Sequence, residues 1–328
     1  MKAVSIVLFL TLGSVGQQST FRSEANVVLV PALVKDASGR PLYGLVVKDF
    51  SIKDDGVDQT VRLDEAAQSE PVSLVVAVQR GRSARFEYER MKGLSAMLDP
   101  ILTSPEAKVA IVAFDDDVEL VHDFTSDSFS IRGGLQQILS KRLDRWTPQP
   151  GEGGAAIFDA VSYSLKLLNR RPIKRQRVLL LISETRDHGS HYAKINDVIA
   201  AMSNTNASVF ALTFSPAKTN VLDTLRGNNN DRWKPVPDLL YPVQEVAQGL
   251  RKNAAKEITS LTGGEYATFT SGKGFDARLT EFTNHLHSRY LLSFEPKNPH
   301  PGLHHLQVAV KAQQVTVLAR STYWARGS

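Results

Sequence analysis

The chain has 328 residues, a formal net charge of +5, and 42% hydrophobic and 22% charged residues, as in ordinary globular proteins. It contains no cysteine, which excludes disulfides, thiolate metal centres and cysteine nucleophiles. The longest basic cluster, residues 170–177, has no aromatic residues among its arginines and lysine, so we expect no nucleic-acid partner.

Residues 1–16 have the form of a secretory signal. Lys2 supplies a positive charge, residues 3–12 form an apolar core, and Ser14 and Gly16 make a small-x-small cleavage site. The apolar run is much shorter than the roughly 20 residues that span a bilayer. We therefore expect a secreted or periplasmic protein with no transmembrane segment after cleavage of this signal.

Residues 24–70 predict a small antiparallel β module. Its first strand contains Pro31, which predicts an edge position or a bulge because proline cannot donate a ladder hydrogen bond. Alternating polarity in 49–53 predicts a half-exposed strand. The Asp-Gly turn at 55–56 then predicts a hairpin with a partner strand at 59–63.

From residue 71 to 289, apolar strands alternate with helices, which predicts an α/β domain with a doubly wound, mostly parallel sheet. The first strand, 72–78, is a near-continuous apolar run, as expected for a strand covered on both faces. Residues 217–242 are rich in Asn and Pro and predict a long irregular excursion. Further strands are expected at 108–114, 118–121, 177–183, 207–214 and 265–269, and helices at 87–102, 128–139, 155–168, 192–205, 243–261 and 274–289.

Residues 290–326 return to the antiparallel pattern, with three strands expected at 290–294, 306–310 and 314–318. We expect these strands to pair with the module at 24–70. The two flanks would then form one small β-sandwich, with the α/β domain at 71–289 inserted between them.

Three loops are expected at the edge of the sheet where α/β proteins bind ligands, at residues 79–83, 151–160 and 183–187. Together with motifs in the flanks, they resemble the von Willebrand factor type A (vWA) domain. The chain is most similar to a group of secreted bacterial vWA proteins abundant in Acidobacteria, over roughly residues 24–325. The flanking motifs are residues 36–45, 49–50, 55–56, 262–264, 289–294 and 320–325.

The resemblance implies a metal-ion-dependent adhesion site, in which an Asp-x-Ser-x-Ser loop, a Thr and an Asp hold Mg²⁺ and a ligand carboxylate completes the octahedron. In this chain, Gln79 stands at the position of the first Asp and Gly81 at that of the first Ser, while Ser83 matches the second Ser. Ala155 occupies the Thr position, and Glu184 occupies that of the last Asp.

The altered site keeps few ligands for a cation. Ser83 offers a hydroxyl and Glu184 a carboxylate, but Arg80 and Arg82 would repel a divalent ion. We therefore predict a degenerate adhesion site with no Mg²⁺ and no other cofactor. Arg80, Arg82, Ser83, Glu184 and Arg186 are predicted to contact a partner by charge and hydrogen bonding instead.

Other acidic groups are predicted to be structural. The three aspartates at 115–117 follow a strand, and we expect a solvated turn there rather than a Ca²⁺ site. Asp159 is expected to be a local structural partner. No recognisable nucleophile motif is present, and Ser83 has no histidine nearby in sequence, which counts against a hydrolase.

The histidines give weak signals. His300, His304 and His305 lie in a Pro-rich segment that we expect to be a surface loop, with adventitious transition-metal binding as the alternative. His285 and His287 are expected on opposite sides of one helix, so they should not converge on a metal.

The sequence thus predicts an exported, non-enzymatic protein that binds a protein partner or mediates adhesion. One alternative is a metal-dependent adhesion module in which Glu184, Ser83 and waters hold Mg²⁺ or Mn²⁺. A hydrolase on the same sheet is a second alternative. The sequence does not distinguish a purely structural envelope role from binding, nor does it identify the partner or the oligomeric state.

Overall fold

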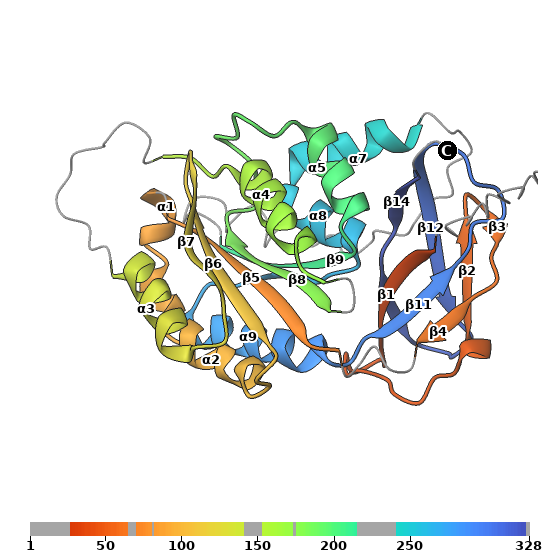
Figure 1. Ribbon diagram of the computed structural model, residues 1–328, viewed down its shortest axis with the longest axis horizontal. Helices are drawn as coiled ribbons and strands as arrows, with labels where there is room; N and C mark the ends of the chain where they lie inside the picture. The colour runs from red at the N-terminus through yellow and green to blue at the C-terminus, as the bar shows by residue number, and fades with distance from the viewer. Residues whose placement is uncertain are drawn as a thin grey trace, which may run out of the picture.

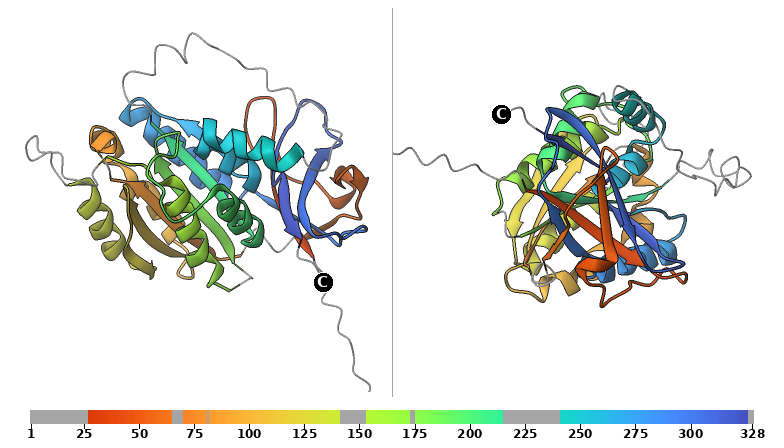
Figure 2. Two further views of the ribbon diagram at one scale, coloured as in Figure 1. Left: turned by 90° about the horizontal axis from the view of Figure 1, so that it is seen from above. Right: turned by 90° about the vertical axis from the view of Figure 1, so that its right-hand side faces the viewer.

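The computed structural model describes residues 27–64, 70–80, 82–140, 153–172, 175–214 and 241–325. The expected signal at 1–16 and residues 217–240 of the excursion expected at 217–242 lie outside the described residues, whereas residues 241–242 begin a helix. A six-stranded sheet stands between two layers of helices, and two four-stranded sheets form a sandwich beside it (Figure 1). Figure 2 shows the sandwich strands gathered at one end of the molecule. The predicted fold class is confirmed.

The larger unit is built on the strand order β10-β9-β8-β5-β6-β7, in which every neighbouring pair is parallel except β6 and β7. Its strands are β5 (Val72–Gln79), β6 (Lys108–Phe114), β7 (Val118–Thr125), β8 (Gln176–Ser183), β9 (Ala207–Thr213) and β10 (Tyr266–Thr268). Its helices are α1 (Arg82–Arg85), the 3-10 turn η3 (Tyr88–Met91), α2 (Leu94–Leu102), α3 (Ser128–Leu139), α4 (Ile157–Asn169), α5 (Ile195–Asn204), α7 (Tyr241–Lys252), α8 (Ala254–Thr262) and α9 (Gly272–Leu286).

Strand β5 lies at the centre of this sheet, and all of its residues are buried. Because successive side chains of a strand point to opposite faces, β5 contributes side chains to two separate cores. Leu74 and Val76 pack in the core beneath α2, α3 and α9, whereas Val75 and Ala77 pack in the core beneath α4, α5 and α8. Burial on both faces explains why the sequence of β5 shows no alternation.

The sandwich combines strands from both flanks in the orders β13-β1-β11-β4 and β14-β12-β2-β3. A single core fills the space between the two sheets, with Val30, Ile52, Leu292 and Phe294 almost fully buried. The strands are β1 (Val28–Lys35), β2 (Phe50–Asp54), β3 (Val57–Asp58), β4 (Arg62–Asp64), β11 (Tyr290–Phe294), β12 (Gly302–Val310), β13 (Thr316–Ala319) and β14 (Thr322–Ala325), with a 3-10 turn η1 (Val47–Asp49).

Two expectations for the first module need correction. Strand β1 is not an edge strand, because β11 and β13 pair on its two sides. Pro31 is tolerated because pairing with β13 begins only at Ala32, which leaves no strand on that side of the proline. The Asp-Gly hairpin forms between β2 and the short β3, but the next strand, β4, crosses to the other sheet and pairs with β11.

Two predicted helices are interrupted and one strand was missed. The helix expected at 87–102 is divided into η3 and α2, and the helix expected at 243–261 is divided into α7 and α8. The second break lies at Asn253, whose side chain caps α8 by accepting a hydrogen bond from the Lys256 N–H at 2.9 Å. The final flank contains four strands rather than three, because β14 follows β13 after a short turn.

Arg320, between β13 and β14, fastens the sandwich to the larger unit. Its buried guanidinium donates to the carbonyl oxygens of Met202 and Ser203 near the end of α5, at 3.2 and 2.6 Å, and to Asn206 Oδ1 at 2.9 Å. Burial lowers the pKa of Arg320 to about 10, so it remains a cation at neutral pH. A cation at a helix carboxyl end is favourable because the last carbonyl groups lack partners within the helix.

Gly264 offers a direct test of the packing between α8 and β9. A Cβ at Gly264 would lie 1.7 Å from the Val209 carbonyl oxygen, so the β9 backbone would have to move. Gly264→Ala is expected to lower the free energy of unfolding by about 3 kcal/mol, the upper part of the range for overpacking. Urea unfolding followed by circular dichroism measures this change.

Gly133→Ala is the matched control. Gly133 is exposed on α3, and a Cβ added there would meet no other atom within 4 Å. Alanine should therefore be neutral or stabilising by up to about 1 kcal/mol at this position. Equal stability of the two variants would contradict the close approach at Gly264.

Candidate functional site

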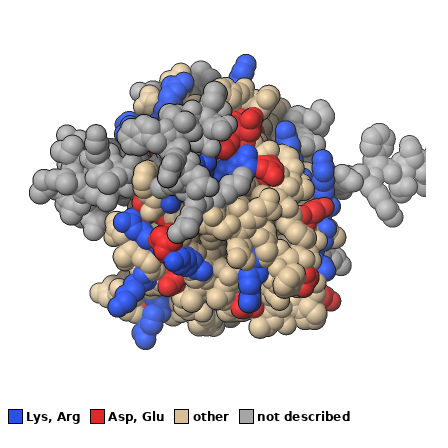
Figure 3. Space-filling view, turned by 90° about the vertical axis from the view of Figure 1, so that its left-hand side faces the viewer, with Lys and Arg blue, Asp and Glu red and all other residues tan. Residues whose placement is uncertain are grey.

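The loops at the carboxyl ends of β5, β6 and β8 meet at one edge of the sheet, on the side of α1 in Figure 1. The chain positions them because neighbouring parallel strands end at the same edge. The start of α4 joins this group through a pair of backbone hydrogen bonds between Ala155 and His188. Lys/Arg and Asp/Glu side chains are interspersed on this side of the molecule (Figure 3).

Gln79 connects the first loop to the third. Its side chain is fully buried, its Oε1 accepts a hydrogen bond from the Glu184 backbone N–H at 2.8 Å, and its Nε2 donates to Glu184 Oε1 at 3.1 Å. An amide can make both bonds because it carries a donor and an acceptor. An ionised aspartate at this position could accept from the N–H but could not donate to Glu184.

His188 holds the second oxygen of the same carboxylate. Its Nε2 lies 3.0 Å from Glu184 Oε2, and the ring is 47% exposed. The hydrogen bond to Glu184 raises the pKa of His188, although partial burial opposes the shift. Glu184 is therefore held on one side by a neutral amide and on the other by a histidine that favours the charged form. The sequence patterns did not reveal His188, because it belongs to no motif of the family.

Arg80 is engaged within the chain. Its Nε donates to Asp115 Oδ2 at 2.9 Å, and its Nη1 forms an ion pair with Glu119. The guanidinium that is predicted to contact a partner is thus also paired with two carboxylates of the chain itself. Asp115 also departs from the expected solvated turn, because its side chain is only 16% exposed and accepts a hydrogen bond from Arg80.

Asp159 and Asp187 organise the third loop. The Asp159 carboxylate accepts hydrogen bonds from the backbone N–H groups of His191 at 2.8 Å and Tyr192 at 3.1 Å, in agreement with a structural role. Asp187 Oδ1 accepts from the Phe158 N–H at 2.9 Å and from Ser190 Oγ at 2.6 Å. Burial raises the pKa of Asp187 despite these bonds.

Of the remaining predicted residues, the structure describes the side chains of Ala155 and Arg186. Gly81 lies outside the described residues. Arg82 and Ser83 begin α1, but the structure describes only their backbone. Ala155 is fully buried and contributes no side-chain oxygen. Arg186 is exposed, and its Nε donates to the carbonyl oxygen of Lys252 at the end of α7, at 3.2 Å.

The described donor atoms do not fit the Mg²⁺ site that the family implies. Mg²⁺ requires an octahedron of hard oxygen ligands, usually with one or two carboxylates. Here the Gln79 oxygen accepts a backbone hydrogen bond, and both oxygens of Glu184 are already bonded to Gln79 and His188. Ala155 supplies nothing in place of the threonine.

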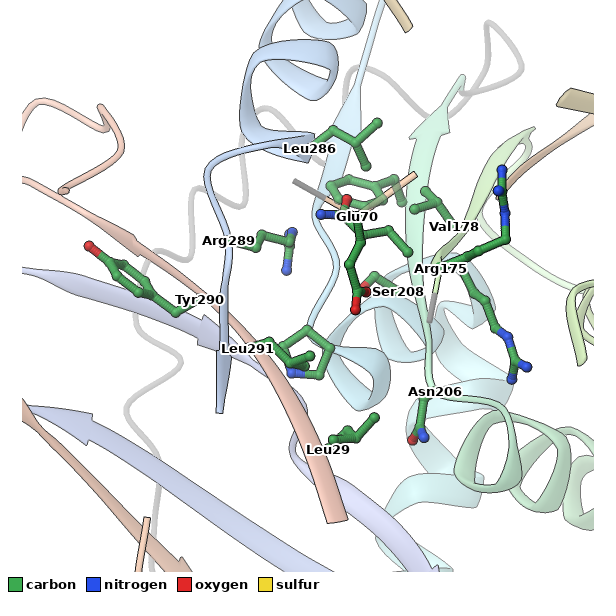
Figure 4. Close-up of a pocket in the computed structure, with 14 residues that line it drawn as sticks. Leu29, Glu70, Arg175, Val178, Asn206, Ser208, Leu286, Arg289, Tyr290 and Leu291 are labelled. Atoms are coloured by element: carbon green, nitrogen blue, oxygen red, sulfur yellow. The ribbon is translucent and has the colours of Figure 1, made fainter. Parts of the chain in front are cut away.

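A small cavity lies between the sandwich and the larger unit (Figure 4). Its cavity volume is about 70 Å³, which is far below the several hundred Å³ of typical small-molecule sites. Arg289 lies over the Phe210 ring at 4.7 Å, and Arg175 donates to Ser73 Oγ at 2.8 Å, so these arginines have structural partners. We do not assign a ligand to this cavity.

Comparison with known families finds that residues 73–189 match the model for the von Willebrand factor type A domain. The matched residues include β5, β6, β8 and the loops described above, so this part of the chain is similar to a vWA domain. None of the curated proteins matches the chain.

Two solved structures illustrate the distance to other proteins. A conserved hypothetical protein, BatB from Bacteroides thetaiotaomicron, is 16% identical with a TM-score of 0.41, covering 66% of this chain and 98% of that one. A von Willebrand factor type A protein from Catenulispora acidiphila is 12% identical with a TM-score of 0.39, covering 93% of this chain and 75% of that one. At such scores neither structure informs on what this chain binds.

The His188–Glu184 contact predicts a pH dependence of stability. A histidine whose pKa is raised in the folded state stabilises the fold fully below its unfolded pKa of roughly 6.5, and the stabilisation is lost as pH rises through the folded pKa. Wild type should therefore exceed His188→Gln in unfolding free energy by most in mildly acidic solution. Denaturant unfolding across this pH range measures the difference.

His287→Gln serves as the control, since His287 is exposed on the surface beyond α9. The difference between this control and wild type should be small at every pH. A difference for His188→Gln that grows with rising pH would contradict the assigned contact.

Proposed function

We propose that this vWA-containing chain is an exported, non-enzymatic protein that binds a protein partner at the carboxyl edge of its six-stranded sheet without a metal ion. The observation that carries the proposal is the hydrogen-bonded chain of Gln79, Glu184 and His188. In the family, an ion at this edge faces an acidic group of the ligand. Here the positions of the ion's ligands are joined directly to one another.

His188 is the residue best suited to take over the charge of the ion. Its raised pKa favours the imidazolium form, and nearly half of the ring is open to solvent. A carboxylate of a partner can therefore approach the exposed part of this ring, whose Nε2 stays bonded to Glu184. Arg186 adds a second exposed cation on the same loop. Charge-assisted hydrogen bonds of this kind give orientation as well as affinity.

Two exposed aromatic residues on the segments that follow β5 and β8 supply apolar contact area. Phe86, just after α1, is 63% exposed, and Tyr192, on the loop after β8, is 81% exposed. Both follow the carboxyl ends of adjacent strands, β5 and β8. Aromatic residues are enriched among the anchors of protein interfaces, where a few side chains carry most of the binding free energy.

The polar groups of this edge do not support a hydrolase. Among the described residues, Ser183 Oγ is buried and donates to the Glu184 carbonyl oxygen at 2.7 Å, and Ser190 Oγ donates to Asp187. His188 bonds to a carboxylate. A nucleophile paired with a general base, which acyl transfer requires, is not formed by these groups.

Export is proposed from the signal pattern of residues 1–16. Within the described part of the chain, no helix has the length and apolarity needed to cross a membrane. Partner capture is therefore best sought in the envelope fraction of the source cells.

Capture of an envelope protein by crosslinking tests the binding edge. The double variant Phe86→Ala with Tyr192→Ala should lose capture, because each aromatic anchor contributes about 2 kcal/mol, or about 30-fold in affinity. Phe129→Ala is the matched control. Phe129 is 83% exposed, but it lies on α3 after β7, whose end pairs near the beginning of β6 at the opposite edge of the sheet. Equal loss in the control would exclude this edge as the binding surface.

The metal-free part of the proposal is tested by calorimetric titration of wild type with Mg²⁺ and Mn²⁺. We expect no heat of binding and no shift in melting temperature from either ion. Capture of the partner should likewise be unchanged when Mg²⁺ or Mn²⁺ is added. Binding of either ion that depends on Glu184 would favour the metal-dependent adhesion alternative instead.

A further inference from the structure

A group of histidine and carboxylate side chains lies in the sandwich, on elements that the vWA edge does not use. Asp54 ends β2, Asp55 begins the turn to β3, His300 precedes β12, and His304 lies on β12. The pairing of β12 with both β2 and β14 brings Asp54 and Tyr323 to the two sides of His304. His304 was expected on a surface loop, but it is a buried strand residue with 1% of its side chain exposed.

The polar atoms of this group converge on a small space. His304 Nδ1 lies 3.1 Å from Asp54 Oδ1 and 2.9 Å from Asp55 Oδ2. His300 Nε2 lies 3.3 Å from the same Asp55 oxygen. One atom from each of Asp55, His300 and His304 lies within 4.8 Å of the other two. The two imidazole rings are stacked with their centroids 4.0 Å apart.

The hydrogen bonds of His304 determine which ring nitrogen carries the proton. Its Nε2 lies 2.8 Å from the carbonyl oxygen of His300, which can only accept, so Nε2 carries a proton. Its Nδ1 lies at hydrogen-bond distance from the Asp54 carboxylate, so without an ion Nδ1 would have to carry a second proton. In the neutral ring, Nδ1 then presents a lone pair toward oxygens of Asp54 and Asp55. Three electron-rich atoms so close together repel one another unless a positive charge lies between them.

The contacts of Asp55 allow a metal ion, and not only a proton, to supply this charge. Its Oδ2 is buried and makes no hydrogen bond, although nitrogens of His300 and His304 both approach it. Two ligand atoms about 2.0 Å from a tetrahedral ion are roughly 3.3 Å apart, so the observed separations of 2.9 and 3.3 Å are close to those of a ligand set.

We propose that Asp55 Oδ2, His300 Nε2 and His304 Nδ1 bind a divalent transition-metal ion, Zn²⁺ in particular. Nitrogen and carboxylate ligands without thiolates suit Zn²⁺, and three protein ligands leave a fourth position for water beside Asp54. The side chain of His300 is 46% exposed and that of Asp55 21%, so an ion can enter from solvent.

The surrounding contacts orient these ligands. The bond from His304 Nε2 to a carbonyl oxygen is the arrangement that fixes the ring of a metal-binding histidine. Asp55 Oδ1 accepts from the His305 N–H at 2.9 Å, which leaves Oδ2 for the ion. Asp54 Oδ2 accepts from the Tyr323 hydroxyl at 2.7 Å. A bound ion would tie the β2–β3 turn to the segment before β12.

The other similar group in the described chain does not share this property. Glu265, Glu281 and His285 also lie within reach of one another. However, Lys35 Nζ lies 3.2 Å and Arg289 Nη2 3.6 Å from the Glu265 carboxylate, so its charge is already balanced. A divalent ion there would be repelled by both cations.

The test uses the purified full chain, stripped of metal and titrated with Zn²⁺ by calorimetry, with metal analysis of the dialysed product. We expect one Zn²⁺ per chain, a higher melting temperature on binding, and visible ligand-field absorption when Co²⁺ replaces Zn²⁺. His300→Ala and Asp55→Asn should each weaken Zn²⁺ binding by more than the roughly 100-fold that loss of a supporting outer contact can cost.

These variants are chosen because both should fold. His300 is exposed, and Asp55 has a φ of +47°, a conformation that asparagine also tolerates. His287→Ala, at an exposed histidine outside the group, is the control and should bind Zn²⁺ as wild type does. The proposal is overturned if wild type binds no Zn²⁺, which would leave a proton on His304 Nδ1. It is also overturned if the control loses binding as the two ligand variants do, which would mean adventitious binding to surface histidines.

Discussion

The antiparallel ladder between β1 and β11 joins the two flanks of the chain, and the placement of the other elements depends on it. It pairs Val28 with Phe294 at one end and Ala32 with Tyr290 at the other, across the whole length of the α/β unit. Loop-closure entropy grows only slowly with loop length, so a ladder backed by an apolar core can close so long a connection. The amino ends of β5 and β8 then lie near the sandwich, and their carboxyl ends point away from it (Figure 1). The candidate binding edge is thereby left accessible to a partner.

The carboxyl edge of the sheet and the histidine group of the sandwich differ in how their negative charges are compensated. At the carboxyl edge, Glu184 is bonded to Gln79 and His188, and Asp115 is bonded to Arg80. In the sandwich, Asp55 keeps a buried oxygen without a hydrogen bond, beside two histidine nitrogens. Buried charge is costly unless it is compensated. This contrast is why we propose that the family's site has lost its ion while a different site in the same chain can hold one.

The sequence was sufficient wherever one segment determined its own structure. Continuous apolar runs predicted β5 and β8. The loop motifs predicted that Gln79 and Glu184 lie at one edge of the sheet, where the two side chains are hydrogen-bonded. It was insufficient wherever a distant partner decided the outcome. Strand β4 is too short to show a pattern and is defined by its pairing with β11. His304 looked like a loop residue among prolines, but β2 and β14 pair on both sides of its strand. The direction of Arg80 depends on Asp115 and Glu119, which no local pattern links to it.

The paired ends of β4 and β11 have a mechanical consequence. The chain leaves the sandwich at Asp64 and returns at Leu291, and these two residues are directly opposite each other in the ladder. Two covalent crossings at one place act as a hinge. Arg320 follows β13, at the other edge of the same sheet, where it donates hydrogen bonds to carbonyl oxygens near the end of α5. A swing of the α/β unit against the sandwich about the β4–β11 edge would therefore have to break the bonds of Arg320.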